Sequence, residues 1–226
     1  MLLGTGESGK STLFKQMKIL YGDYQMNQSE MDETRLVIFS NILDSMHTML
    51  ERCEAFGLRE TVTAVDAWEV VQNASTVDPT VGAAIEQLWS GPEIQETWTR
   101  RNEYNIIDSI AYFFDNIIRV SSPGYMCKSS YSDQERKQYE QDYLYARQTT
   151  TNIHIERLSI NNVRFEFIDV GGQKSERRRW LKFFGNVTAV LFIASLSDYN
   201  TTLVENPDLN RYVPTYMTSL CDMILP

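Results

Sequence analysis

The segment GTGESGKS, residues 4–11, matches the phosphate-binding pattern G-x-x-x-x-G-K-[ST] at every fixed position. Gly4 and Gly9 permit backbone angles that side chains disfavour, so the loop amides can converge on phosphate oxygens. The helix that follows adds its N-terminal amides and its dipole. Lys10 can reach the outer phosphates, and the Ser11 hydroxyl suits Mg²⁺, which prefers oxygen ligands. The motif predicts a nucleoside triphosphate ligand but not the identity of its base.

The overall charge of the chain argues against general nucleic-acid binding. Acidic residues outnumber basic ones by 30 to 21, for a net charge of -9, whereas a nucleic-acid binder needs a basic face. A nucleotide pocket needs only a few local positive groups. The 226 residues, 42% hydrophobic and 23% charged, are typical of a soluble globular protein.

Neither the cysteines nor the apolar runs indicate a secreted or membrane-spanning protein. Cys53, Cys127 and Cys221 are far apart and lack C-x-x-C spacing, which favours free thiols in a reducing cytosol over disulfides or a zinc site. No signal peptide or N-terminal myristoylation signal is evident, and the longest strongly apolar run, 187–194, is too short to cross a bilayer.

Helical periodicity dominates the first two thirds of the chain. A helix is expected over 10–21, with Leu13, Met17 and Leu20 on one face, and a long helix over 29–55. The apolar face expected for the long helix consists of Leu36, Phe39, Leu43, Met46, Leu50 and Cys53. Shorter helical patterns follow around Ala64–Trp68–Val71, Val81–Ile85–Leu88 and Ile106–Ile110–Phe113–Ile117. Between 28 and 145 no strand is expected, and the polar stretch 128–140 is interpreted as a solvated loop or frayed helix end.

The pattern changes after this helical block. Two β-type runs, 153–160 and 163–168, are joined by Asn161-Asn162, and asparagine tolerates the positive φ of a tight hairpin turn. The apolar run 187–194 predicts a central strand covered on both faces. A last helix is expected to carry Leu209, Val213, Tyr216, Leu220 and Ile224.

These elements predict an α/β nucleotide-binding domain interrupted by an all-helical insertion. The α/β domain is expected over 1–26 and 146–226, and the inserted helical domain over 27–145.

Two further segments carry candidate phosphate-sensing residues. The segment IDVGGQ, 168–173, ends a strand with Asp169, which can support a Mg²⁺ ion opposite Ser11. Gly172 can direct its amide to a γ-phosphate, and Gln173 can orient a water for attack. In ARQTTT, 146–151, a hydroxyl can complete the Mg²⁺ coordination and the arginine can neutralise charge in the transition state.

Together these segments resemble the α subunits of heterotrimeric G proteins, the P-loop (Ras-like) GTPase fold with an inserted helical domain. The resemblance rests on GESGKST followed by KQMKI, on DVGGQKSERRRW, on NVTAVLFIASLSDYN and on RNEYNIIDSIAYFFDNI, and it covers nearly the whole chain. The roles below are those known for this family, carried over by position.

The resemblance implies a nucleotide site, a metal site and a catalytic set. The implied nucleotide-binding residues are Gly4, Thr5, Gly6, Glu7, Ser8, Gly9, Lys10, Ser11, Thr12, Asp108, Ser109, Tyr145, Ala146, Arg147, Thr150, Asp169 and Gly172. The Mg²⁺ ligands would be Ser11 and Thr150, with Asp169 behind the metal, and the catalytic residues Lys10, Arg147 and Gln173.

Some of these residues have more specific implied roles. Glu7 matches an acid that pairs with the catalytic arginine. Asp108 and Ser109 match residues that close over the nucleotide. Tyr145 stands where many members have a basic residue near the ribose.

A partner surface is also implied. Ile153, Arg177, Arg178, Arg179 and Trp180 match the switch surface that meets the βγ dimer or an effector, although a basic run of this kind can also be a solvated helix face.

The sequence departs from the family in two respects. Asn152 replaces the glycine that usually follows the paired threonines, which leaves Thr151 as a second candidate ligand. The Asn-Lys-x-Asp segment that selects guanine in the family does not occur, nor do the last strands, the C-terminal helix and the lipidated N-terminus. We therefore expect a fragment or truncated product with an unpaired strand edge and open apolar surface.

The resemblance predicts a GTPase that switches between GTP and GDP states with Mg²⁺. Expected partners are a βγ dimer, a G protein-coupled receptor, an effector and an RGS-type regulator. The expected location is cytoplasmic, at the cytoplasmic face of the plasma membrane, with membrane association only through the missing N-terminus or partners. Two alternatives stay open: a non-catalytic module that binds βγ or an effector, and another P-loop ATPase or kinase.

Overall fold

The structure, a computed structural model, describes residues 1–22, 24, 26–127, 131–150, 153–172, 185, 187–196, 199, 202–203 and 206–210. The chain divides into two compact units, one made of Met1–Gln25 with Thr149–Pro226 and the other of Met26–Gln148. The second unit begins one residue earlier and ends three residues later than the expected helical insertion. No helix in these described ranges is long and apolar enough to span a bilayer.

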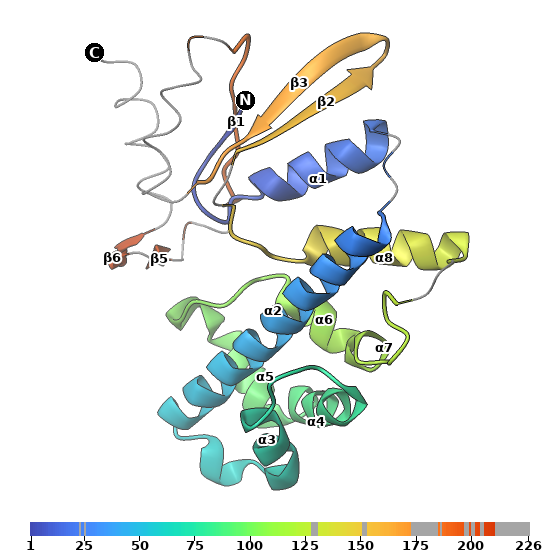
Figure 1. Cartoon of the computed structure of the whole chain (residues 1–226). Helices are drawn as coiled ribbons and strands as arrows, with labels where there is room; N and C mark the ends of the chain where they lie inside the picture. Colours follow the sequence, from blue (N-terminus) through green and yellow to red (C-terminus); the bar gives the residue numbers. More distant parts are fainter. Residues whose placement is uncertain are drawn as a thin grey trace. The chain divides into compact units, whose positions relative to one another are not determined.

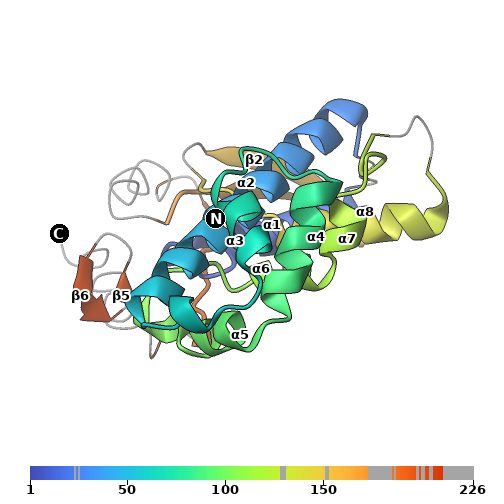
Figure 2. The ribbon, with the colours of Figure 1, turned by 90° about the horizontal axis from the view of Figure 1, so that it is seen from below.

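The second unit contains helices and no strand among its described residues, as expected. Its elements are α2 (Gln28–Ala55), η1 (Arg59–Thr61), α3 (Val65–Gln72), α4 (Pro79–Trp89), α5 (Pro92–Thr99), η2 (Arg101–Glu103), α6 (Ile110–Asp115), α7 (Ile117–Val120) and α8 (Asp133–Tyr145). In Figure 2, α4 lies beside α7. Trp68, Phe113 and Phe114 are fully buried in the core of this unit.

The long helix α2 begins at a capping box. The Asn27 side chain accepts from Glu30 N–H, and the Glu30 carboxylate accepts from Asn27 N–H, which satisfies two backbone donors that the helix itself leaves free. The expected buried face is wrong at its start, because Leu36 is 64% exposed. Ile38 and Ile42 are buried in its place, and the stripe continues through Met46 and Met49 to Cys53.

Residues 133–140 of the stretch expected to be a loop or frayed helix end lie instead in α8. Ser132 and Glu135 make a second capping box at its start. The helix is polar overall, yet it buries Tyr139 and Asp142. The interpretation as a loop or frayed end was wrong for these residues. It was based on the polar, charged composition, which does not show that two side chains face inward.

Asp142 anchors α8 through a buried polar network. The carboxylate is fully buried and forms a bidentate ion pair with Arg119, at 2.7 and 2.8 Å. It also accepts hydrogen bonds from the hydroxyls of Tyr112, at 2.6 Å, and Tyr125, at 3.0 Å. A buried charge that is paired and fully hydrogen-bonded in this way holds α8 in one orientation against α6 and α7.

The first unit is built on a mixed sheet of order β2-β3-β1-β4. Its strands are β1 (Leu2–Leu3), β2 (His154–Ile160), β3 (Val163–Asp169) and β4 (Leu191–Phe192). β1 runs parallel to both β3 and β4, while β2 and β3 are antiparallel. The helix α1 (Lys10–Tyr21) starts where the expected helix starts and lies along the hairpin (Figure 1). This confirms the α/β class expected for the parts flanking the helical insertion.

The β2–β3 hairpin turns at Asn161 and Asn162, as expected. Their φ angles are 51° and 65°, the left-handed pair that a two-residue hairpin turn requires. Because the turn is symmetric about these residues, it fixes the register of every pair, including His154 opposite Asp169.

Three expectations for this unit are wrong. Leu20 is 62% exposed and does not join the inner face of α1. The strand expected over 187–194 is only Leu191–Phe192, and Leu191 is 50% exposed instead of being covered on both faces. Leu209 lies in β6 (Asn206–Asn210), which pairs antiparallel with β5 (Thr202–Leu203), and not in a helix. The rest of the expected last helix lies outside the described residues.

Candidate functional site

The phosphate-loop motif connects β1 directly to α1. Leu2 and Leu3 are buried in the sheet, and the Leu3 carbonyl accepts from Ile193 N–H at 2.7 Å. Gly4 has φ 148° and packs so closely that a Cβ atom would overlap the carbonyl oxygen of Ile193. Gly9 precedes α1 with φ 92°. Both glycines therefore hold the conformations that the motif requires.

Lys10 is buried and turns back into the loop. Its Nζ donates to the Thr5 carbonyl at 2.5 Å and approaches Ser8 Oγ at 3.4 Å. The ammonium is thus held beside the loop backbone, where its charge is available to an anion bound in the loop.

Three oxygen-bearing side chains from distant parts of the chain meet next to this lysine. Ser11 Oγ donates to Asp169 Oδ2 at 2.8 Å and lies 2.7 Å from Thr150 Oγ1. We call Ser11, Thr150 and Asp169 the oxygen cluster. Ser11 comes from the first turn of α1 and Asp169 from the last position of β3, whose pairing with Leu2 sets it beside the loop. The structure therefore brings together the three residues predicted as metal site.

Asp169 is the electrostatic centre of the oxygen cluster. It is 2% exposed, and burial raises the pKa of its carboxyl group above the ordinary value. The hydrogen bond from Ser11 and the charge of Lys10 oppose this rise. Asp169 Oδ1 is buried and has no hydrogen-bond partner among the described residues. A buried carboxylate oxygen without a partner is costly unless a further positive group or donor completes it.

The donor set of the oxygen cluster suits a hard divalent cation. It offers two hydroxyl oxygens and a carboxylate, one oxygen of which has no hydrogen-bond partner in the described part of the chain. Such ligands fit Mg²⁺ when phosphate and water complete the coordination. The described residues contain no group of three or more His, Cys, Asp or Glu side chains that could hold a metal by themselves. The cluster therefore fits a cation that arrives with a phosphorylated ligand.

Gly172 lies close to Lys10 and to the backbone of Thr5. A Cβ atom at this position would overlap Lys10 Nζ and approach the Thr5 carbonyl oxygen to 2.5 Å. Only glycine allows this approach, so the backbone after β3 lies against the phosphate loop.

The candidate residues of the helical unit are arranged around the end of α8. The Ser109 hydroxyl donates to the Tyr145 carbonyl at 3.0 Å, and the Tyr145 ring stacks on Tyr112 at 4.2 Å. Asp108 is exposed. Ala146 is buried and donates its N–H to the Asp142 carbonyl at 2.8 Å. The structure thus brings Ser109 and Tyr145 together.

Arg147 is held by a residue that the sequence interpretation did not include. Asn41 accepts from Arg147 N–H at 2.8 Å and donates to the Arg147 carbonyl at 2.9 Å. Asn41 is separated from Arg147 by 106 positions, and no local pattern connects the two. His154 was also missed, although its place opposite Asp169 follows from the symmetric turn at Asn161-Asn162.

Several predicted residues lie outside the described part of the chain. These are Gln173, Arg177, Arg178, Arg179 and Trp180, together with the second candidate ligand, Thr151. Ile153, predicted for the same partner surface, is half-buried against the small core formed by Met1, Leu3, Ile168 and Val170.

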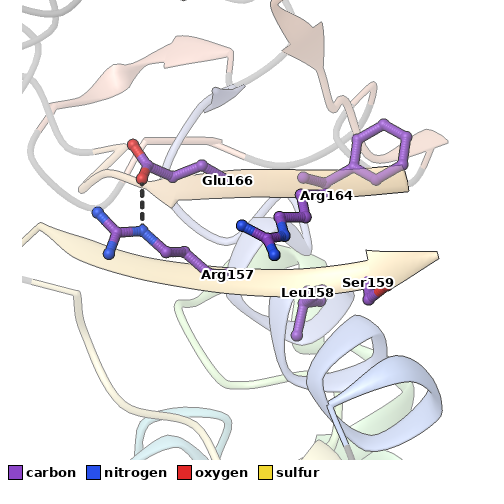
Figure 3. Close-up of a pocket in the computed structure, with 6 residues that line it drawn as sticks. Arg157, Leu158, Ser159, Arg164 and Glu166 are labelled. Carbon is purple, nitrogen blue, oxygen red and sulfur yellow. Dashed lines mark hydrogen bonds and ion pairs between the residues drawn. The ribbon is translucent and has the colours of Figure 1, made fainter. Parts of the chain in front are cut away.

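A separate pocket lies on the hairpin (Figure 3). It is lined by Arg157, Leu158, Ser159, Arg164, Phe165 and Glu166. Arg157 Nε and Glu166 Oε2 form an exposed ion pair of 2.8 Å across the two strands. None of these residues was predicted as a site residue.

Comparison with known proteins identifies relatives of this chain. The model of the G-protein alpha subunit family matches residues 1–218. The chain is 36% identical over 232 residues to a guanine nucleotide-binding protein subunit alpha of Cryphonectria parasitica. This alignment covers 98% of this chain and 62% of that protein. It is 39% identical over 219 residues to the guanine nucleotide-binding protein alpha-7 subunit of Caenorhabditis elegans, covering 93% of this chain and 58% of that protein.

The chain thus spans about three fifths of the length of these curated relatives. The family match extends over nearly all of it and includes both the phosphate loop and the segment that ends in Gly172. This chain belongs to the G-protein alpha subunit family.

Proposed function

We propose that this chain binds guanine nucleotides and hydrolyses GTP to GDP and phosphate as part of a signalling switch. The observation that carries the proposal is the oxygen cluster beside Lys10, with Ser11 at 2.7 Å from Thr150 and 2.8 Å from Asp169. The names of the relatives, guanine nucleotide-binding proteins, support guanine as the base.

The phosphate loop binds the triphosphate. Residues 4–12 surround the phosphates with backbone amides, helped by the N-terminus of α1. Lys10 neutralises the outer phosphates from its buried position. Because the loop spans a buried strand and a helix, it is organised before the ligand arrives, and the phosphates gain fixed dipoles in place of water.

Ser11 and Thr150 would hold Mg²⁺ directly, and Asp169 would support it, since its Oδ1 atom has no hydrogen-bond partner among the described residues. When bound, Mg²⁺ supplies positive charge that offsets the charge on the β- and γ-phosphates during transfer.

Hydrolysis needs a positioned water and charge stabilisation, and four residues are proposed to provide them. Gln173 orients the water, and the Gly172 amide binds a γ-phosphate oxygen. Arg147 and Lys10 stabilise the charge that spreads over the transferring group. Asp108, Ser109, Tyr145 and Ala146 are proposed to contact the nucleotide from the helical unit.

The proposed biological role is that of the family. In the GTP state the segment that includes Trp180 and its basic neighbours binds an effector, and in the GDP state it binds a βγ dimer. A receptor would accelerate exchange, and an RGS-type regulator would accelerate hydrolysis. The proposed location is the cytoplasmic face of the plasma membrane.

Titration of the purified chain with GTP and ATP, each with Mg²⁺, tests this proposal. The proposal predicts tight, saturable binding of GTP and none of ATP at the same concentrations. Preference for ATP would instead indicate another P-loop ATPase or kinase. Binding of neither nucleotide would overturn the proposed activity and favour a non-catalytic module that binds βγ or an effector.

A further inference from the structure

A single side chain holds both backbone polar groups of Arg147. Asn41 Oδ1 accepts from Arg147 N–H at 2.8 Å, and Asn41 Nδ2 donates to the Arg147 carbonyl at 2.9 Å. We call these two bonds the Asn41 clamp. A carboxamide carries one acceptor and two donors, so it can satisfy both groups of one residue at once. The clamp replaces the two hydrogen bonds that Arg147 gives up by lying just beyond the end of α8.

Asn41 is itself well fixed. It lies on α2 between the buried residues Ile38 and Ile42, and its polar side chain is half-buried. Movement of Asn41 would require movement of the core helix that carries it. The clamp therefore fixes the backbone of Arg147 relative to the packed core of the helical unit.

The chain leading into Arg147 is restrained from a second direction. The backbone carbonyl of Asp142 accepts from Ala146 N–H, while the Ser109 hydroxyl donates to the Tyr145 carbonyl. Asp142 is in turn paired with Arg119 in the core. Arg147 is thus the last residue of a restrained segment, three positions before Thr150 of the oxygen cluster.

We propose that Asn41 is a positioning residue for GTP hydrolysis, acting through Arg147. The inference rests on the proposed function, in which Arg147 stabilises charge on the transferring phosphoryl group. A long arginine side chain contributes most when its backbone is already oriented, because fewer torsions remain to be fixed in the transition state. Asn41 needs no contact with the nucleotide for this role.

The clamp can be tested with Asn41→Ala in the purified chain. We expect the single-turnover rate of GTP hydrolysis to fall about 10- to 100-fold, the scale seen when a catalytic group is slightly misplaced. GTP affinity should be unchanged, because ground-state binding does not use the clamp. The affinity for GDP with aluminium fluoride, a mimic of the transferring phosphoryl group, should fall in parallel with the rate.

Asn116→Ala is the matched control. Asn116 also donates from its side chain to a backbone carbonyl in the same unit, that of Tyr112 at 2.8 Å, and it is also partly buried. Its loss should leave the hydrolysis rate at the parental value. Circular dichroism of both variants checks the fold, and Asn41→Ser carries the same test should Asn41→Ala fail to fold.

A double-mutant cycle distinguishes positioning from general destabilisation. In an Arg147→Ala background, Asn41→Ala should cause no further loss of rate. An unchanged rate in the single Asn41→Ala variant would overturn the inference, as would an equal loss with and without Arg147. Failure of the parental chain to bind and hydrolyse GTP would instead overturn the proposed function and remove the basis of the inference.

Discussion

The hydroxyl of Ser11 donates a 2.8 Å hydrogen bond to Asp169 Oδ2, and this bond joins the first turn of α1 to the last residue of β3. The same hydroxyl lies 2.7 Å from Thr150 Oγ1. Three segments that are far apart in the sequence therefore converge on one oxygen atom. Loss of that atom tests whether the convergence serves a bound cation.

Replacing Ser11 with alanine should weaken Mg²⁺-dependent GTP binding. We expect the affinity to fall at least about tenfold with Mg²⁺ present, or about 1.4 kcal/mol. With Mg²⁺ removed by a chelator, parent and variant should bind equally weakly. Calorimetric titration under both conditions measures this. Ser159→Ala, an exposed serine on β2, is the control, and an equal loss with and without Mg²⁺ would contradict a metal role for Ser11.

Replacing Gly172 with alanine should affect GTP more than GDP. The added Cβ atom would overlap Lys10 Nζ and approach the Thr5 carbonyl, so the backbone after β3 must move away from the phosphate loop. A contact with the γ-phosphate is then lost, whereas GDP has no γ-phosphate to lose. Competition of labelled GDP by GTP measures the ratio of affinities. Gly185→Ala, where a Cβ atom meets no described atom within 4 Å, should leave the ratio unchanged. An unchanged ratio in Gly172→Ala would refute the contact.

Removing the Asp142 carboxylate should destabilise the helical unit. Asp142→Ala leaves Arg119 without its bidentate partner and removes the acceptor of the Tyr112 and Tyr125 hydroxyls. Breaking a buried ion pair from one side costs about 3–5 kcal/mol. Chemical denaturation followed by circular dichroism measures the loss of unfolding free energy.

Two further variants serve as controls for Asp142→Ala. The double variant Arg119→Met, Asp142→Leu should lose less stability, because no unpaired charge remains. Glu103→Ala, which breaks an exposed ion pair with Arg100, should change little; if Asp142→Ala behaves alike, the network is not stabilising.

The helical unit should lose stability above pH 10. Burial raises the pKa of Tyr104 to about 12, and burial with the neighbouring Asp142 carboxylate raises the pKa of Tyr112 and Tyr125 further. When the pKa of a tyrosine is higher in the folded than in the unfolded chain, keeping the hydroxyl protonated contributes to folding stability. This contribution is fully present below the pKa of the unfolded chain, 10, and is lost as the pH rises through the pKa of the folded chain. Absorbance at 295 nm should show exposed tyrosines ionising first and these three ionising only with unfolding.

Tyr104→Phe provides the check on the alkaline transition. The variant loses the hydrogen bond from Tyr104 to the Thr97 carbonyl, at a cost of about 1 kcal/mol at neutral pH. Its free energy of unfolding should nevertheless fall less steeply between pH 10 and pH 12, because the variant lacks the hydroxyl proton that Tyr104 releases on unfolding. A slope identical to that of the parent would show that Tyr104 ionises normally in the folded chain.

Local patterns were sufficient to predict the phosphate loop, α1 and the hairpin. Each depends on short-range chemistry: glycine conformations, helical spacing, and the positive φ of Asn161 and Asn162. The oxygen cluster followed from motifs matched to a family, since no local rule brings Thr150 to Ser11.

The failures have identifiable physical causes. On α2, apolar residues are adjacent as well as periodic, so the spacing fits both a face with Leu36 and the observed face with Ile38 and Ile42. For α8, the prediction of a loop followed the polar composition of the segment, and the two buried positions were too few to indicate a helix. The Asn41 clamp could not be predicted, because it joins a side chain to backbone groups 106 residues away. Only the tertiary structure brings such groups together.

Single-turnover hydrolysis tests the central claim most directly. GTP labelled on the γ-phosphate is bound to the purified chain in the absence of Mg²⁺, and the reaction is started by adding Mg²⁺. The account predicts release of one phosphate per bound nucleotide, and a rate that falls sharply in Gln173→Leu while GTP stays bound. Release at the parental rate in that variant, or no Mg²⁺-dependent release from the parent chain, would contradict it.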